Sequence, residues 1–131
     1  MPKTLQCMSV SHIIFNNRNE LIRINPFKVV YYEAYGNYSY AVFTNGVKVI
    51  LPVGLTDLQQ ILLRELKERA RIFLHIGRRF IVNTEFVVKV CVPKQQLTLC
   101  DMVSNTIYNL PISKEALKKI KNMYINKQIW N

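Results

Sequence analysis

Glycine, proline, cysteine and acidic side chains are all scarce in this sequence. Its 131 residues include only 4 glycines and 5 prolines, while 50% of the residues are hydrophobic. That composition excludes a collagen-like chain and argues against a disordered one. No apolar run reaches the roughly 18 residues of a membrane-spanning helix, and the first residues lack the apolar core of a signal peptide. We therefore expect a cytoplasmic protein with no membrane partner.

The three cysteines, Cys7, Cys91 and Cys100, are an odd number at irregular spacing. Such a set does not make a disulfide framework and is typical of a reducing compartment. No CxxC pair is present, and neither His12 nor His75 has a metal-ligand partner at a suitable spacing. The sequence also lacks nucleotide-binding glycine loops and catalytic serine motifs. We therefore expect no metal, no cofactor and no enzyme activity.

Acidic side chains number 8, against 18 lysines and arginines, which gives a net charge of +10. Residues 1–65 carry 6 basic and 4 acidic side chains, whereas residues 66–131 carry 12 and 4. A basic excess on one side of a compact chain suggests a polyanionic partner, with nucleic acid first. The alternative is a soluble domain whose charged face is simply solvated.

Short strands account for most of the expected secondary structure, and the length fits one domain. Asn45 and Gly46 give the strongest hairpin signal, because a type I′ turn needs positive φ at both central residues. Residues 28–53 are therefore expected to form an antiparallel meander. The expected strands cover residues 12–15, 20–24, 28–33, 38–44, 47–53, 72–76, 80–82, 85–92, 97–100 and 106–112.

Two segments have apolar residues at helical spacing. In the first, Thr56 can cap the helix and Gln59, three residues later, completes a capping box, which predicts a helix over about residues 57–71. Its apolar stripe is expected to cover the sheet as part of the core. The second helix is expected to begin at Ser113, a favourable N-cap, and to fray after about residue 125.

Residues 33–40 join a tight turn to polar and aromatic side chains. Gly36 and Asn37 can adopt positive φ, so the chain is expected to turn sharply there. The turn would then present Asn37, Tyr38 and Ser39, which can donate hydrogen bonds to phosphates or to base edges.

Two further segments combine a turn or helix start with basic side chains. Residues 75–80 connect two apolar strands through Gly77, with Arg78 and Arg79 at the end of the turn. Because adjacent strand residues point to opposite faces, only one of the two arginines is expected to face a given groove. Residues 111–115 form a loop that enters the second helix, where free backbone N–H groups favour a phosphate.

Each of these features also has a purely structural interpretation, which is favoured when the feature is taken singly. Gly36 and Asn37 fit an ordinary hairpin turn. Arg78 and Arg79 fit a charged sheet edge that blocks aggregation, and Ser113 fits a simple helix cap.

Taken together, the three segments resemble the signatures of the LytTR DNA-binding domain in order and spacing. The resemblance covers about residues 12–122. It is carried by residues 33–38 (EAYGNY) with Leu55 and Leu58 in the following helix, by residues 73–83 (FLHIGRRFIVN), and by residues 110–114 (LPISK) with Leu117.

The resemblance implies a mainly β, elongated antiparallel fold of about ten short strands, with one clear helix and a C-terminal helix. Residues 1–11 would be an N-terminal extension, residues 12–122 the DNA-binding domain and residues 123–131 a C-terminal tail. Because so few residues precede the match, we expect a stand-alone regulator without the receiver domain that usually accompanies such an output domain.

The resemblance also implies sequence-specific binding of duplex DNA by loops that enter successive major grooves, in the role of a transcription regulator. Two copies on repeated half-sites, bound as a homodimer, would add specificity. The sequence departs from the family's usual residues at positions 75, 77, 79 and 115, which bears on the target sequence. The candidate DNA-binding residues are Asn37, Tyr38, Ser39, Tyr40, Arg78, Arg79, Ser113, Lys114 and Lys118.

Two other functions use the same scaffold differently. A protein-interaction module would use Tyr31, Tyr35, Tyr38 or Tyr40 as anchors, because tyrosine is common at binding hot spots. A single-stranded nucleic-acid binder would use the same tyrosines as stacking platforms. Strand packing is the structural alternative for all four.

Overall fold

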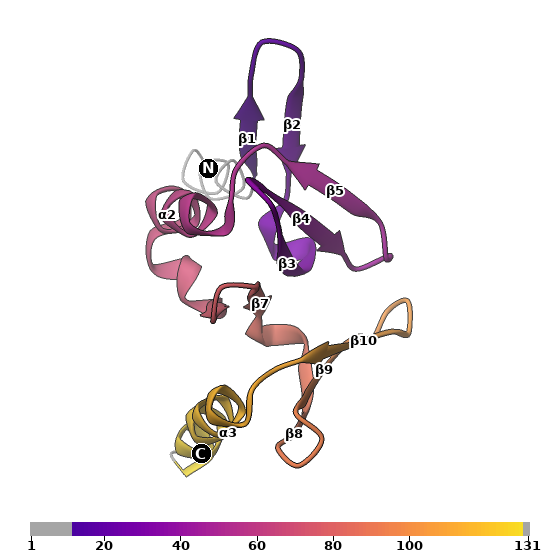
Figure 1. Ribbon diagram of the computed structural model, residues 1–131, viewed down its shortest axis with the longest axis vertical. Coiled ribbons are helices and arrows are strands. Elements are labelled where there is room, and N and C mark those ends of the chain that lie inside the picture. The colour runs from indigo at the N-terminus through magenta and orange to yellow at the C-terminus, as the bar shows by residue number, and fades with distance from the viewer. Residues whose placement is uncertain (1–11, 130–131) are drawn as a thin grey trace, which may run out of the picture. The chain divides into compact units, whose positions relative to one another are not determined.

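The structure, a computed structural model, describes residues 12–129, with side chains described as far as residue 126. The expected N-terminal extension and Trp130 lie outside the described residues. The chain divides into two compact units, of which the first ends at Thr84 and the second begins at Glu85. Residues 12–129 contain ten strands, all paired antiparallel, together with two α-helices and three short 3-10 helices (Figure 1).

The first unit opens with a hairpin of β1 (Ile13–Asn16) and β2 (Leu21–Ile24), drawn in indigo in Figure 1. Asn17 fixes the turn, because its side-chain Oδ1 accepts hydrogen bonds from the backbone N–H groups of Asn19 and Glu20 at 2.9 and 3.0 Å. Such a local bond lets a short polar side chain hold a turn without secondary structure of its own. The strands expected over residues 12–15 and 20–24 are confirmed, with bounds that differ by one residue.

The main element of the first unit is a five-stranded sheet in the order β5-β4-β3-β7-β6. Its first three strands form the predicted meander, and 3-10 helix η1 (Pro26–Lys28) leads into it. The loop between β4 and β5 spans four residues. Gly46 in this loop has a φ of +84°, whereas Asn45 has no positive φ. The expected type I′ turn is therefore wrong. The strands are β3 (Val29–Tyr35), β4 (Tyr38–Phe43), β5 (Lys48–Leu51), β6 (Phe73–Ile76) and β7 (Phe80–Asn83).

The first α-helix, α2 (Leu55–Leu66), begins and ends earlier than the sequence pattern predicted. Gly54 is its N-cap, without a side-chain cap, so the predicted capping box at Thr56 and Gln59 is wrong. At Lys67 the backbone turns to a φ of +54°, which stops the α-helix, and the chain continues as 3-10 helix η2 (Lys67–Ile72). A right-handed helix needs negative φ at every residue, so a residue with positive φ cannot continue it and lies at its end.

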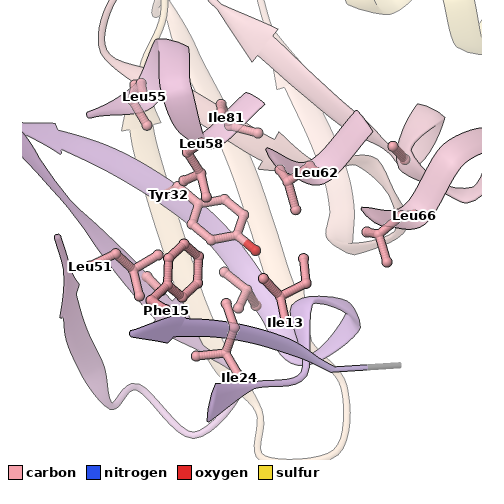
Figure 2. Packing of buried hydrophobic residues seen from close by; sticks show 13 residues of the cluster. Ile13, Phe15, Ile24, Tyr32, Leu51, Leu55, Leu58, Leu62, Leu66 and Ile81 are labelled. Atoms are coloured by element: carbon pink, nitrogen blue, oxygen red, sulfur yellow. The ribbon is translucent and has the colours of Figure 1, made fainter. Parts of the chain in front are cut away.

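The core of the first unit lies between α2, one face of the sheet and the β1–β2 hairpin. Leu55, Leu58, Leu62 and Leu66 are the buried stripe of α2, as predicted. Figure 2 shows Leu58 and Leu62 near the Tyr32 ring of β3, with Leu55 and Leu66 toward the two ends of α2, and Phe15 of the hairpin belongs to the same cluster. Each fully buried leucine contributes about 1.5–3 kcal/mol, so this stripe is a main source of stability for the unit.

Tyr32 is fully buried, and its hydroxyl has no hydrogen-bond partner among the residues that the structure describes. Burial raises the pKa of Tyr32 far above its ordinary value, because a phenolate cannot be solvated there. Leaving a buried hydroxyl without a partner costs free energy, on the order of 1–3 kcal/mol. The packing of the ring outweighs that cost.

The second unit follows 3-10 helix η3 (Thr84–Phe86) and contains a three-stranded sheet in the order β10-β9-β8. Its strands are β8 (Val87–Cys91), β9 (Gln96–Asp101) and β10 (Thr106–Pro111). The helix α3 (Lys114–Ile129) comes last and extends past the predicted fraying point near residue 125. Its predicted cap is confirmed, because the Ser113 Oγ accepts a hydrogen bond from the Ala116 backbone N–H at 3.3 Å. The buried apolar side chains are Leu97, Leu99, Leu110, Ile112, Leu117 and Ile120.

Candidate nucleic-acid interface

Two of the predicted segments meet at one end of the five-stranded sheet. The β3–β4 turn contains Gly36 and the β6–β7 turn contains Gly77. Because Glu33 of β3 pairs with Phe80 of β7, the end of one strand lies beside the start of the other. The Ala34 N–H also donates to the carbonyl oxygen of Arg79 at 2.9 Å. The strand register therefore places the two turns side by side.

Glycine is required at both turns because of the backbone. Gly36 and Gly77 each have a φ of +59°, in the left-handed region where a β-carbon is strained. A β-carbon built on either glycine would meet nothing within 4 Å, so space is not the constraint. The shape of each turn is therefore set by the main chain, and the neighbouring side chains are left exposed.

The two turns line a cavity of about 760 Å³ at this end of the sheet, which we call the turn pocket, and a third wall closes it. The wall is the N-terminus of α2, including Gly54, whose β-carbon would lie 3.7 Å from the Asn37 carbonyl oxygen. A helix N-terminus carries a partial positive charge that favours anions. The lining residues are Ala34, Gly36, Asn37, Gly54, Leu55, Thr56, Asp57, His75, Gly77 and Arg78.

The structure separates the roles of the two adjacent arginines. Arg79 donates to Oε2 of Glu33 from Nη2 at 3.2 Å and from Nε at 3.3 Å, and its guanidinium lies 5.0 Å from the Phe80 ring centroid. Arg78 is exposed and lines the turn pocket, and it has no ion pair within the described part of the chain. Arg78 is therefore the arginine that is available to a ligand.

The first turn presents some of its predicted residues and hides another. Asn37 and Tyr38 are exposed, as expected. Ser39 is fully buried, and its hydroxyl donates to the Val53 carbonyl oxygen at 2.9 Å. The expectation that the turn presents Ser39 to a ligand is therefore wrong, because side chains alternate along β4 and position 39 faces inward. Tyr40 is partly exposed and its ring lies 4.6 Å from that of Tyr35.

The third segment belongs to the second unit. The Ser113 hydroxyl is occupied as an acceptor in the helix cap, and Lys114 and Lys118 are exposed one turn apart on α3. Residues four apart on a helix share a face, so the two ammonium groups are on the same side of α3. Glu115, in the first turn of α3, stabilises the helix start.

Sequence reasoning missed a side-chain contact between His75, which lines the turn pocket, and Gln59 of α2. His75 and Gln59 lie 16 residues apart, yet the His75 Nδ1 and the Gln59 Oε1 are 2.7 Å apart in a hydrogen bond. This bond ties β6 to α2 and replaces the capping role that the sequence suggested for Gln59. For the start of α2, the local sequence signal was Gly54, directly before the apolar stripe, because glycine is accepted at an N-cap.

Two findings concern chemistry that the described part of the chain lacks. Residues 12–129 hold no group of three or more histidine, cysteine, aspartate or glutamate side chains that could bind a metal ion. No helix in the same residues is long and apolar enough to cross a membrane.

No protein-family model matches this sequence, and no curated protein matches it. Among solved structures, the chain is similar to the LytTr DNA-binding domain of a protein from Bacillus cereus. The TM-score is 0.58 at 16% sequence identity, and the match covers 87% of this chain and 96% of that domain. The likeness confirms the predicted fold, which is mainly antiparallel β with ten strands and two helices in the residues described.

Proposed function

We propose that this chain, which has the fold of a LytTr DNA-binding domain, binds duplex DNA in a sequence-dependent manner and regulates transcription. In this proposal the exposed turns at the end of the five-stranded sheet enter a major groove. Asn37, Tyr38 and Arg78 contact base edges there, and exposed lysines neutralise phosphates.

The observation that carries the proposal is the exposed, unpaired Arg78 beside Asn37 at the turn pocket. A guanidinium offers a planar fork of donors that matches O6 and N7 of guanine, and an asparagine amide matches N6 and N7 of adenine. These two side chain types carry much of the direct base recognition in major grooves. The Glu33 carboxylate engages Arg79, so it leaves Arg78 free for this contact.

Lys114, Lys118 and the Ser113 region support the same function from the second unit. The start of α3 presents two ammonium groups and a helix N-terminus, which together suit DNA phosphates. The whole chain has a net charge of +10, which favours binding to a polyanion. A single small domain buries limited DNA surface, so we propose that two copies bind repeated half-sites.

Selection from a random duplex library, followed by titration of the selected sequence at two salt concentrations, tests the proposal. We expect an enriched motif, and an affinity whose logarithm falls steeply with the logarithm of salt concentration. If no sequence is enriched and binding does not respond to salt, the protein does not read duplex DNA, and a protein-interaction role takes its place.

A further inference from the structure

The face of the five-stranded sheet opposite α2 carries a cluster of tyrosines at the same end as the turns. Residues that pair directly across antiparallel strands share a face. The register pairs Tyr35 with Tyr38 and Tyr40 with Ile50, whereas the neighbouring Tyr32 points to the α2 side. We call the set of Tyr35, Tyr38, Tyr40, Lys48 and Ile50 the tyrosine face.

The rings of the tyrosine face are accessible to a ligand. Tyr35 and Tyr38 each expose 50% of their surface, and Ile50 exposes 48%. The Tyr35 and Tyr40 rings lie 4.6 Å apart at 34°, so one ring braces the other and leaves its outer side open. Exposed apolar side chains that are contiguous, as these are, are typical of binding sites, whereas single ones are not.

Lys48 offers a cation to an anionic ligand at the tyrosine face, because it has no ion pair among the described residues. The Lys48 ammonium lies 5.5 Å from the Tyr40 ring centroid, and the Arg79 side chain remains 60% exposed beside Glu33. A groove of about 590 Å³ continues from Tyr38 and Lys48 along β5 toward the β1–β2 turn. Two acids accompany these cations: Glu33, which lies on the same face directly opposite Tyr40 and is paired by Arg79, and Glu20 at the far end of the groove.

Flat aromatic rings beside cations match one class of polyanion better than others. Bases of a duplex are stacked on one another and offer only their edges, so a tyrosine on a sheet face cannot stack on them. Unpaired bases expose their faces, and proteins that bind single strands combine aromatic platforms with a positively charged groove.

We propose that the tyrosine face binds an unpaired nucleotide strand, with bases stacked on Tyr35 and phosphates along Lys48. Tyr35 is not among the proposed duplex contacts, so the two proposals can be tested separately at that ring, whereas Tyr38 belongs to both sites. DNA and RNA share the chemistry that the site recognises.

Binding of a labelled oligothymidylate of about 12 nucleotides, which is within the usual site size, tests the proposal on the full chain by fluorescence anisotropy. An abasic strand of the same length is the matched probe, because it keeps the phosphates and removes the bases. We expect the oligothymidylate to bind much more tightly than the abasic strand. Equal binding of the two strands, or no binding of oligothymidylate at low salt, would overturn the proposal.

Variants at Tyr35 separate stacking from folding. Tyr35→Leu should weaken oligothymidylate binding about five- to a hundredfold, as loss of base–aromatic stacking does, while Tyr35→Phe should bind like the original chain. Both variants should melt at nearly the same temperature, because Tyr35 is exposed. If Tyr35→Leu and Tyr35→Phe bind the strand equally, the ring is not a stacking platform.

Three further measurements test the cation, the independence from duplex binding and the sugar. Lys48→Gln should weaken binding and lower the salt dependence by about one counterion. Tyr35→Leu should leave binding to the selected duplex unchanged, so a failure of this proposal is distinguishable from a failure of the duplex proposal. Competition by oligouridylate and by oligodeoxyuridylate, which differ only in the 2′-hydroxyl, identifies the sugar: stronger displacement by oligouridylate assigns the site to RNA, and stronger displacement by oligodeoxyuridylate assigns it to DNA.

Discussion

The carboxylate of Glu33 holds the guanidinium of Arg79 across two neighbouring strands, at 3.2 Å from Nη2 and 3.3 Å from Nε. The two residues are 46 positions apart in the chain. Arg78, next to Arg79 in the same turn, borders the turn pocket and has no ion pair within the described residues. The pairing thus distinguishes two adjacent arginines and leaves only Arg78 without an ion pair among the described residues.

Arg78 is expected to matter more for duplex binding than Arg79. Arg78→Ala should cost about 1–3 kcal/mol of binding free energy and relax the preference at one base position, because a forked base contact is lost. Arg79→Ala should have a smaller effect, since that guanidinium is engaged with Glu33. Titration of both variants against the selected duplex and single-base mismatches measures this. A larger loss for Arg79→Ala would reverse the assignment.

Ser39 and Asn37 are expected to separate stability from DNA binding. Ser39→Ala removes a buried hydrogen bond to the Val53 carbonyl oxygen and should destabilise the fold by about 1 kcal/mol, with little effect on duplex affinity. Asn37→Ala should leave the stability unchanged and weaken duplex binding. Urea unfolding and binding titrations of both variants provide the measurement. Weaker DNA binding by a fully folded Ser39→Ala variant would contradict the buried, structural role.

The β6–β7 turn is expected to depend on glycine for its conformation. Gly77→Ala should cost about 1–2 kcal/mol of stability, because a β-carbon at a φ of +59° is strained. Gly77→Asn should cost less, since asparagine tolerates the left-handed region. Chemical unfolding of the two variants gives the comparison. If alanine proves as well tolerated as asparagine, the turn does not need its positive φ.

Tyr32 is expected to make the fold sensitive to alkali. The folded pKa of Tyr32 is raised, so its contribution to stability is fully present below the unfolded pKa of about 10 and is lost progressively as the pH rises above that value. Tyr32→Phe removes the buried, unpartnered hydroxyl and should be as stable or more stable at neutral pH. It should also lose less stability than the original chain above about pH 10. Urea unfolding across this pH range decides the point, and an identical pH profile for both chains would count against a buried neutral phenol.

Local patterns in the sequence predicted most of the fold. Runs of strand-favouring residues between turn signals located the strands, and glycines at residues 36 and 77 located two turns, where the structure has positive φ. The apolar stripe of α2 was correctly assigned to the core. These features depend on neighbours within a few residues, which is why one sequence was enough to find them.

Contacts between distant residues account for what sequence reasoning missed. Gln59 bonds to His75 of β6, so the side chain that seemed part of a capping box has a distant partner. The choice between Arg78 and Arg79 depends on Glu33, which only the strand register brings near. Side chains alternate along residues 38–40, and Tyr38 is exposed. This alternation could have predicted that Ser39 points inward.

The two turns keep their shape through the main chain at Gly36 and Gly77, around which a β-carbon would meet nothing within 4 Å. The exposed positions 37 and 78 can therefore change identity without any repacking of the interior. Most substitutions that create a new function also weaken the fold. Here substitutions at these two positions can change what the turns bind at almost no cost in folding stability. This end of the sheet can therefore evolve readily.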